Sequence, residues 1–265
     1  MFERNIDFID HSVAVYSTGR LACEDFVEIA FLAEHGYGFA ALKLLRGIYE
    51  RTVVGRYIAS DSDQAERFHD YNVIDTQKFS NRASGVYGSD WNPRIDPQRQ
   101  QQYKDAKKKF KYEPCPQCGR PPQDSFTERS LPAMARTIKL PDREVVRLQD
   151  GTEKEVTMED VYLICAAVPN AHIHASMWSF FQRLKKAGDG LIWNVDQGYQ
   201  AEFALSSAHS IMPTVFEAQN DFFNLGLDDE IKDRQRDWHS IWKPGNSKPA
   251  RDEREPADQA TDGTI

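Results

Sequence analysis

The sequence predicts a mainly α-helical bundle. Three observations point to this fold class: apolar residues recur at helical spacing along most of the chain, strands do not alternate with helices, and only one stretch has the character of a β-hairpin. The 265 residues include 15 Phe, 10 Tyr and 5 Trp, enough to bury one substantial core. We therefore expect one helical domain over residues 1–243 with an insertion at about 90–155. Residues 244–265 have no large apolar residue before Ile265, which predicts a disordered tail.

The helices of the first half end at recognisable signals. Gly36 and Gly38 stop the second helix, because glycine readily adopts the left-handed conformation that ends a helix. The polar run 59–63 supplies capping residues that separate the third helix from the fourth. With the apolar periodicity, these signals predict helices over residues 2–18, 20–35, 39–58, 62–84 and 97–112.

The second half begins with a hairpin signal. Asp150-Gly151 stands between two β-compatible runs, a combination typical of a tight turn between antiparallel strands. Thr127 is expected to cap a short helix, Pro169 to join two helices, and Pro213 to kink a long one. The helices predicted here cover residues 127–138, 158–167, 169–186, 199–225 and 228–241, with a loop over 188–198.

Charge and composition narrow the function classes. The formal net charge of −8 gives no overall attraction for nucleic acid or anionic membranes. The N-terminal sequence lacks a basic region followed by an apolar run, and no apolar stretch approaches the roughly 20 residues of a membrane span. The four cysteines fit a reducing compartment. We expect a cytoplasmic protein without membrane contact.

Arg46 and Glu50 are the first candidate site residues. At 100° per residue, Arg46 falls in the stripe of apolar residues on helix 39–58, and Glu50 lies at the edge of that stripe. The two are four residues apart, so they can form an ion pair on the helix surface. A polar group on an apolar face costs free energy unless it finds a partner, which suggests that this pair meets further polar groups.

His174 is the third candidate. On helix 169–186, Asn170 and His174 share one stripe with Met177, whereas His172 falls on the far side. His174 is therefore expected to point inward and His172 outward. If His174 meets Arg46 and Glu50, the three form either an internal network that fixes the helix register or a reactive pocket. In such a pocket Glu50 and His174 would transfer protons and Arg46 would hold an anionic group.

The runs LLRGIYERTVVGRYI, AERFHDY, SLPAMA and NAHIHAS resemble a bacterial helical family known only as a domain of unknown function. Its Leu-x-Arg-x-x-x-Glu pattern and its later tyrosine match this chain, and its late Ser-x-x-x-His-x-Ser matches with asparagine in place of the first serine. The resemblance spans roughly residues 20–225, without much of the insertion over 86–125. It implies a helical fold and groups the matched residues without naming a reaction: Leu44, Arg46, Glu50, Tyr71, Asn170, His174 and Ser176.

Two motifs suggest metal ligands. Cys115-Pro116-Gln117-Cys118 has the spacing of two zinc thiolates, but a closed site needs four ligands and the sequence has no second such pair. Zinc completed by other residues, a reduced loop and a redox pair all remain open. Glu66 and His69 have the Glu-x-x-His spacing of di-iron bundles, which require two such motifs, and only one is present.

Two further motifs suggest contact with nucleic acid. Lys104 to Lys111, with Tyr103 and Phe110, form the main basic run, which would bind RNA or DNA phosphates or else be a solvated helix face. Arg234 and His239 have a spacing similar to that of small helical nuclease domains from toxin and phage-defence systems. That resemblance implies an arginine on phosphate and a histidine on the 2′-hydroxyl.

Two functions follow from these observations. The first is a helical-bundle protein whose Arg/Glu/His cluster is structural and which acts through assembly, as a homo-oligomer, or through binding a partner. The alternative is a metal-independent, nuclease-like or other phosphoester-cleaving enzyme of a bacterial stress or phage-defence system. Its site would be Arg46, Glu50 and His174, with Tyr71, Asn170 and Ser176 around them.

Overall fold

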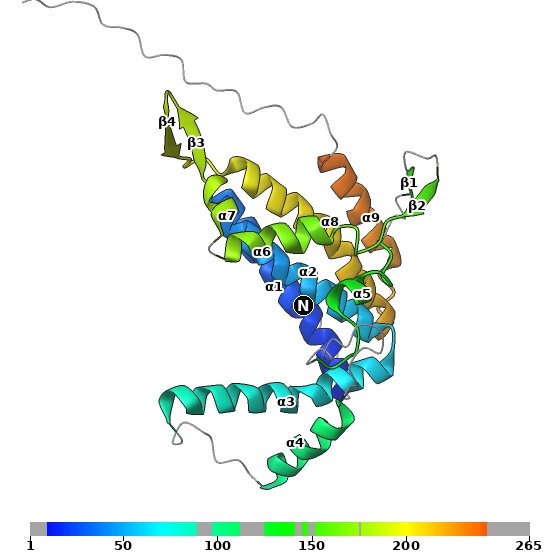
Figure 1. The fold of residues 1–265 in the computed structure, drawn as a ribbon. Coiled ribbons are helices and arrows are strands. Elements are labelled where there is room, and N and C mark those ends of the chain that lie inside the picture. Colours follow the sequence, from blue (N-terminus) through cyan, green and yellow to red (C-terminus); the bar gives the residue numbers. More distant parts are fainter. Residues whose placement is uncertain are drawn as a thin grey trace, which may run out of the picture.

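The computed structural model of the chain describes residues 10–88, 97–111, 125–140, 145–147, 152–174 and 176–242. These residues are predominantly helical, which confirms the predicted mainly α fold class (Figure 1). The helices in chain order are α1 (Asp10–Glu34), α2 (Gly38–Ala59), α3 (Ser62–Tyr87), α4 (Pro97–Lys109), α5 (Leu131–Ala135), the π-helical turn η2 (Leu163–Ala167), α6 (Val168–Ile173), α7 (Met177–Phe181), α8 (Gly198–Phe223) and α9 (Asp228–Ile241).

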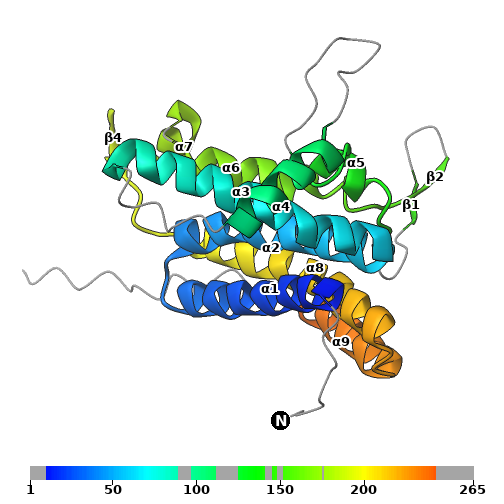
Figure 2. The ribbon, with the colours of Figure 1, turned by 90° about the horizontal axis from the view of Figure 1, so that it is seen from below.

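Helix α2 is the centre of the core. It packs against α1 and α8 on one side and against α6, η2 and α5 on the other, and Figure 2 shows it between these layers. Its buried side chains include Leu45, Ile48, Tyr49 and Val53. A helix surrounded in this way must be apolar on several faces, so a polar residue on it lies close to the neighbouring segments.

Helix α1 is one continuous helix, whereas the sequence predicts two. Gly19 lies in its middle, and the side chain of Gln219 from α8 takes the space that a Cβ atom at Gly19 would need. Gln219 also donates from Nε2 to the carbonyl of Val15 over 2.7 Å. This close approach of α8 holds the glycine in the helix, so tertiary packing outweighs the low helix propensity of glycine.

Helices α3 and α4 lie together on one side of the core (Figure 1). The Asp61 side chain caps α3 by accepting a hydrogen bond from the backbone N–H of Asp63 over 2.9 Å, as the polar break predicts. The ring of Tyr71 on α3 meets the ring of Phe110 just after α4, with centroids 5.1 Å apart. These contacts attach α4 to α3.

The predicted hairpin is confirmed, and a second one was not predicted. Strands β1 (Val145–Arg147) and β2 (Glu153–Glu155) pair antiparallel, and the predicted turn residues Asp150 and Gly151 between them lie outside the described residues. Strands β3 (Leu184–Ala187) and β4 (Gly190–Trp193) also pair antiparallel, where the sequence analysis placed the end of a helix and a loop. The cause is Gly188, whose φ of 59° suits the two-residue Gly-Asp turn.

The prediction of one helix over residues 169–186, just before this second hairpin, is also wrong. Helix α6 ends at Ile173, His174 is extended, and a separate five-residue α7 begins after Ser176. The Ser176 hydroxyl accepts a hydrogen bond from the N–H of Ser179 over 3.1 Å and donates one to the carbonyl of Ala171 over 3.0 Å. These bonds start a new helix in a new direction.

The remaining helices agree with the sequence more closely. α5 is shorter than predicted and is capped by Ser130 rather than Thr127, since the Ser130 hydroxyl accepts from the N–H of Ala133 over 3.3 Å. α8 runs through Pro213, and α9 has the predicted bounds. Within the described ranges, no helix has both the length and the apolar character needed to cross a membrane. The predicted tail over 244–265 lies outside the described residues.

Candidate functional site

Arg46 and Glu50 form the predicted ion pair on α2. Nε of Arg46 donates to Oε1 of Glu50 over 2.7 Å. The side chains retain 35% and 41% of their exposure, so water still reaches both. The pair therefore lies at the edge of the core, which the helical stripe predicts for Glu50, whereas it places Arg46 among the core residues.

Asn170 on α6 joins this pair. Its Oδ1 accepts a hydrogen bond from Nη1 of Arg46, which connects α6 to α2. The guanidinium is thereby held by a carboxylate in its own helix and by an amide from a helix far along the chain. Such a fork of two bonds fixes the plane of an arginine head group.

These three side chains line one cavity, which we call the Arg46 cavity, with a volume of about 290 Å³. Its other walls come from α5 with its cap residue and from the segment that leads through η2. The cavity is lined by Arg46, Glu50, Ser130, Leu131, Pro132, Tyr162, Ala166 and Asn170. Three segments distant in sequence, namely α2, α5 with its cap residue, and the continuous run through η2 into α6, therefore place a guanidinium, a carboxylate, an amide and two hydroxyls around one space.

The wall formed by Tyr162 and Ala166 has an unusual backbone. Residues Leu163–Ala167 make a π-helical turn directly before α6. Turns of this kind are rare and occur often at functional sites. Behind the wall, Tyr49 is fully buried, donates from its hydroxyl to the carbonyl of Met158 over 2.8 Å, and has its pKa raised by burial. The buried bond fixes the segment that precedes Tyr162.

His174 does not reach the Arg46 cavity, so its predicted inward position is wrong. It follows the last residue of α6 with an extended backbone, and its side chain is exposed. The prediction assumed one regular helix over 169–186, and the helix ends before His174. Among the residues that the structure describes, no histidine lines the Arg46 cavity.

His172 is the buried histidine of this region, opposite to the prediction. It is 7% exposed, and its ring lies 5.0 Å from the rings of both Phe39 and Trp178. Its Nδ1 is buried without a hydrogen-bond partner among the described residues. Burial lowers the pKa of His172, and the positive charges of Arg183 and Lys43 lower it further.

Tyr71 and Ser176 also lie away from the Arg46 cavity. Tyr71 is buried between α3 and α4, and its hydroxyl accepts a hydrogen bond from Nζ of Lys78 over 2.7 Å. Ser176 caps α7. Of the six residues grouped from the sequence, the structure brings Arg46, Glu50 and Asn170 together and leaves His174, Tyr71 and Ser176 outside.

Ser130 and Tyr162 line the cavity without having been predicted as site residues. Ser130 begins the run SLPAMA, and its position two residues before Pro132 is a helix-start signal that could have identified it as a cap. Nothing in the sequence distinguishes Tyr162 from the other aromatic residues. Its place in the cavity wall depends on how η2 packs against α2.

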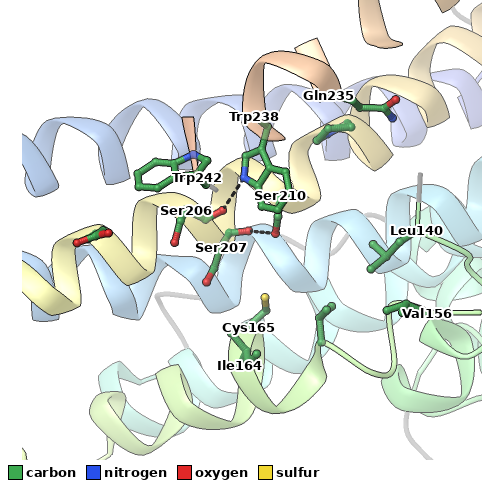
Figure 3. A pocket seen from close by; sticks show the side chains of 13 residues that line it. Leu140, Val156, Ile164, Cys165, Ser206, Ser207, Ser210, Gln235, Trp238 and Trp242 are labelled. Atoms are coloured by element: carbon green, nitrogen blue, oxygen red, sulfur yellow. Dashed lines mark hydrogen bonds between the residues drawn. The ribbon is translucent and has the colours of Figure 1, made fainter. Parts of the chain in front are cut away.

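A second and more apolar cavity, of about 370 Å³, lies between α8, α9 and the segment around η2 (Figure 3). Trp238 and Trp242 form one wall, and their indole N–H groups already donate to the carbonyl of Ser206 over 3.3 Å and to Nδ1 of His209 over 3.1 Å. On the opposite wall, Cys165 is almost fully buried, and burial raises its pKa to about 12. The two tryptophans are four residues apart, Trp238 in the last turn of α9 and Trp242 directly after it, a spacing that the sequence shows.

The metal hypotheses find no support within the described residues. Cys115 and Cys118 lie outside them. In the described part of the chain, no group of three or more His, Cys, Asp or Glu side chains is placed to hold a metal ion. Glu66 instead lies 3.4 Å from Lys109, and His69 lies 3.7 Å from Asp70. The zinc hypothesis remains a prediction.

The basic run on α4 is partly neutralised. Nζ of Lys109 lies 2.6 Å from Asp70 on α3, and this hydrogen bond raises the pKa of Lys109. Lys108 lies 3.6 Å from Asp105, and Lys107 lies over the ring of Tyr103. RNA or DNA binding by Lys104 to Lys111 stays a prediction. Arg234 pairs with Asp237 at 3.0 Å, and the His239 side chain lies outside the described residues.

Fold and site together define a mainly α-helical protein with a polar cavity beside its central helix. Residues 13–191, two thirds of the chain, match a family described as "Family of unknown function (DUF5677)". The chain belongs to this family, in agreement with the resemblance stated from its motifs. The match includes every residue that lines the Arg46 cavity. No curated protein and no solved structure matches the chain.

Proposed function

We propose that the protein binds a small polar molecule with an anionic group in the Arg46 cavity. The observation that carries this proposal is the placement of Arg46, Asn170, Ser130 and Tyr162 around one solvent-accessible space. Ligand sites are concave and fix their ligand through a few convergent polar groups. The Arg46 cavity has both properties.

The donor inventory indicates the ligand chemistry. A guanidinium has five N–H groups, and Arg46 uses Nε for Glu50 and one N–H of Nη1 for Asn170. Among the described residues, its Nη2 has no hydrogen-bond partner, so it is available to a carboxylate or phosphate oxygen. Glu50 offers its second oxygen to a donor on the same ligand. A volume of about 290 Å³ is at the lower end of the range for ligand pockets and suits a metabolite-sized molecule.

Binding is better supported than phosphoester cleavage. The enzyme hypothesis assigned proton transfer to Glu50 and His174 together, and His174 lies outside the cavity. Without an imidazole, the remaining groups are suited to holding an anion rather than to moving two protons. The partial exposure of Arg46 and Glu50 also speaks against a sealed network that serves only to fix the helix register.

The test is a thermal-shift screen of the whole chain with phosphorylated and carboxylated metabolites, each next to its uncharged analogue. We expect at least one anionic compound to raise the melting temperature, because a ligand that binds only the folded state stabilises it. In Arg46→Gln the same compound should give no shift, and in Arg46→Lys a smaller one, because lysine lacks the planar fork.

The matched control is Arg20→Gln on α1. Arg20 forms the same type of pair with a glutamate four residues later, at 2.9 Å from Glu24, but on an exposed face away from the cavity. Its substitution should leave the ligand shift unchanged. A shift that survives in Arg46→Gln, or the absence of any shift with anionic compounds, would contradict the proposal.

A further inference from the structure

Helix α7 and the β3–β4 hairpin, residues 176–195, form a projecting surface that we call the aromatic arm. Figure 1 shows the hairpin projecting beyond the end of the helical bundle. Eight large apolar side chains of this surface retain between 46% and 79% of their exposure. They are Met177, Trp178, Phe180, Phe181, Leu191, Ile192, Trp193 and Val195. An exposed apolar patch of this kind marks an interaction site.

The hairpin has little support within a single chain. Every residue of β3 and β4 is exposed except Leu184, which is half-buried. A two-stranded sheet is at best marginally stable in water and needs a further strand or a packed face. The contacts that hold it are the ring of Phe180, 5.7 Å from Trp193, and the guanidinium of Arg183, 4.1 Å from the Phe39 ring centroid.

The free edge of β4 is ready to pair with another strand. Asn194 donates from its N–H to the carbonyl of Arg183 over 2.7 Å, so its backbone faces β3. Hydrogen bonds alternate along an antiparallel ladder, so Ile192 faces β3 as well, while Leu191 and Trp193 direct their N–H and C=O groups outward. Natural edge strands normally block this outward row with charged residues. β4 has none in its sequence Gly-Leu-Ile-Trp.

We propose that β4 pairs antiparallel with β4 of a second copy of this chain, about a two-fold axis at Ile192. In that register Leu191 of each copy lies opposite Trp193 of the other copy. The two residues whose backbone groups point outward therefore both pair with apolar partners. Such reciprocal contacts are what a two-fold interface requires. The other edge of the hairpin does not compete, because β3 carries Lys185 and Lys186, which would repel their copies.

The available area fits a dimer. A covered aromatic side chain buries roughly 150–250 Å², so the four half-exposed aromatic residues of the arm offer on the order of 400 Å². Met177, Leu191 and Ile192 add to this area. The sum approaches the ~800 Å² per partner of a standard interface. This inference does not depend on the ligand proposed for the Arg46 cavity.

The first test measures the molar mass of the full chain by light scattering after gel filtration. We expect twice the mass of one chain, and a single-chain mass for Ile192→Lys, which sets like charges against each other at the axis. Val27→Lys on α1, at a site 66% exposed, is the control and should remain dimeric. A wild-type monomer, a larger assembly, or a dimer that persists in Ile192→Lys would overturn the proposal.

A cross-linking test fixes the register. In a chain with the four native cysteines replaced by serine, Ile192→Cys places two thiols at the axis in a pair without ladder bonds, where Cα atoms are about 4.5 Å apart and a disulfide can form. Mild oxidation should give a covalent dimer. Lys185→Cys, directly opposite Ile192 on β3, is the matched control and should not cross-link. Equal cross-linking of both variants, or none in Ile192→Cys, would contradict the β4 pairing.

Discussion

The side chain of Arg46 connects α2 to α6. The size of its ion-pair energy shows whether these contacts stabilise the fold or position the guanidinium. Its partner Asn170 is 124 positions away, whereas Glu50 is four positions away. An exposed ion pair at this helical spacing contributes only about 0.3–0.5 kcal/mol to stability. The pair with Glu50 therefore explains little of the fold. Its value lies in holding the guanidinium at a fixed angle to the cavity.

The buried hydroxyl of Tyr49 has a larger effect on stability. Tyr49→Phe removes the hydrogen bond to the carbonyl of Met158 and leaves that buried acceptor unpaired. We expect a loss of about 1–2 kcal/mol in the free energy of unfolding, measured by urea denaturation. Tyr37→Phe, at an exposed residue before α2, should be neutral. Equal effects of the two substitutions would show that the buried bond is not what stabilises the folded state.

His172 should make stability depend on pH. Its pKa is lowered in the folded state, so the unfolded chain binds a proton more readily. The stability is therefore fully present above the unfolded pKa of about 6.5 and falls as the pH decreases through that value. We expect His172→Phe to lose less stability than wild type between neutral and mildly acidic pH, as measured by urea denaturation at several pH values.

The control for this prediction is His174→Phe. His174 is exposed, so its substitution should leave the pH dependence of the wild type in place. His209 has a lowered pKa as well and contributes the same sign in all three proteins. A His172→Phe variant as sensitive to acid as wild type would assign the effect to other groups.

At the scale of elements, the start of α2 depends on contact with the segment before α8. The N–H of Phe39 donates to Oε1 of Gln197 over 3.0 Å. A Cβ atom on Gly38 would lie 2.6 Å from the backbone nitrogen of Ala201, and backbone at that distance has to move. Glycine at residue 38 thus allows two helices to meet closely.

Gly38→Ala should therefore destabilise the protein by about 1–3 kcal/mol, since overpacking forces the backbone apart. Gly85→Ala near the end of α3 is the matched substitution, because a Cβ atom there meets nothing within 4 Å. It should stabilise by about 0.5 kcal/mol through helix propensity. Urea denaturation of both variants gives the comparison, and the same sign for both would contradict the close approach at Gly38.

The elements also show what sequence periodicity predicts. It places α2, α3, α8 and α9 closely, because each is a regular helix with its own start and stop signals. It fails over 169–186, where the Ser176 cap and the Gly188 turn redirect the chain. Gly188-Asp189 is a hairpin signal in its own right. The helical periodicity of the preceding residues predicts a helix here, and the structure forms the hairpin instead.

At the scale of the whole molecule, the candidate site was predictable only in part. The grouping of Arg46, Glu50 and Asn170 was correct because all three lie on segments that are helical, as the sequence periodicity predicts. Ser130 and Tyr162 enter the cavity because α5 and η2 pack against α2, which no local pattern specifies. His174 was misplaced because α6 ends at Ile173 and the backbone of His174 is extended rather than helical. Tertiary packing, which sequence periodicity does not specify, therefore decides which residues complete the cavity.

The thiol of Cys165 has a practical consequence. Thiolates rather than thiols react with alkylating agents, so a group that is 1% exposed and whose pKa is raised to about 12 stays inert while the protein is folded. Its modification rate therefore reports how often the interior between η2 and α8 opens to solvent. Mass spectrometry of the alkylated wild-type chain therefore measures this opening without any substitution.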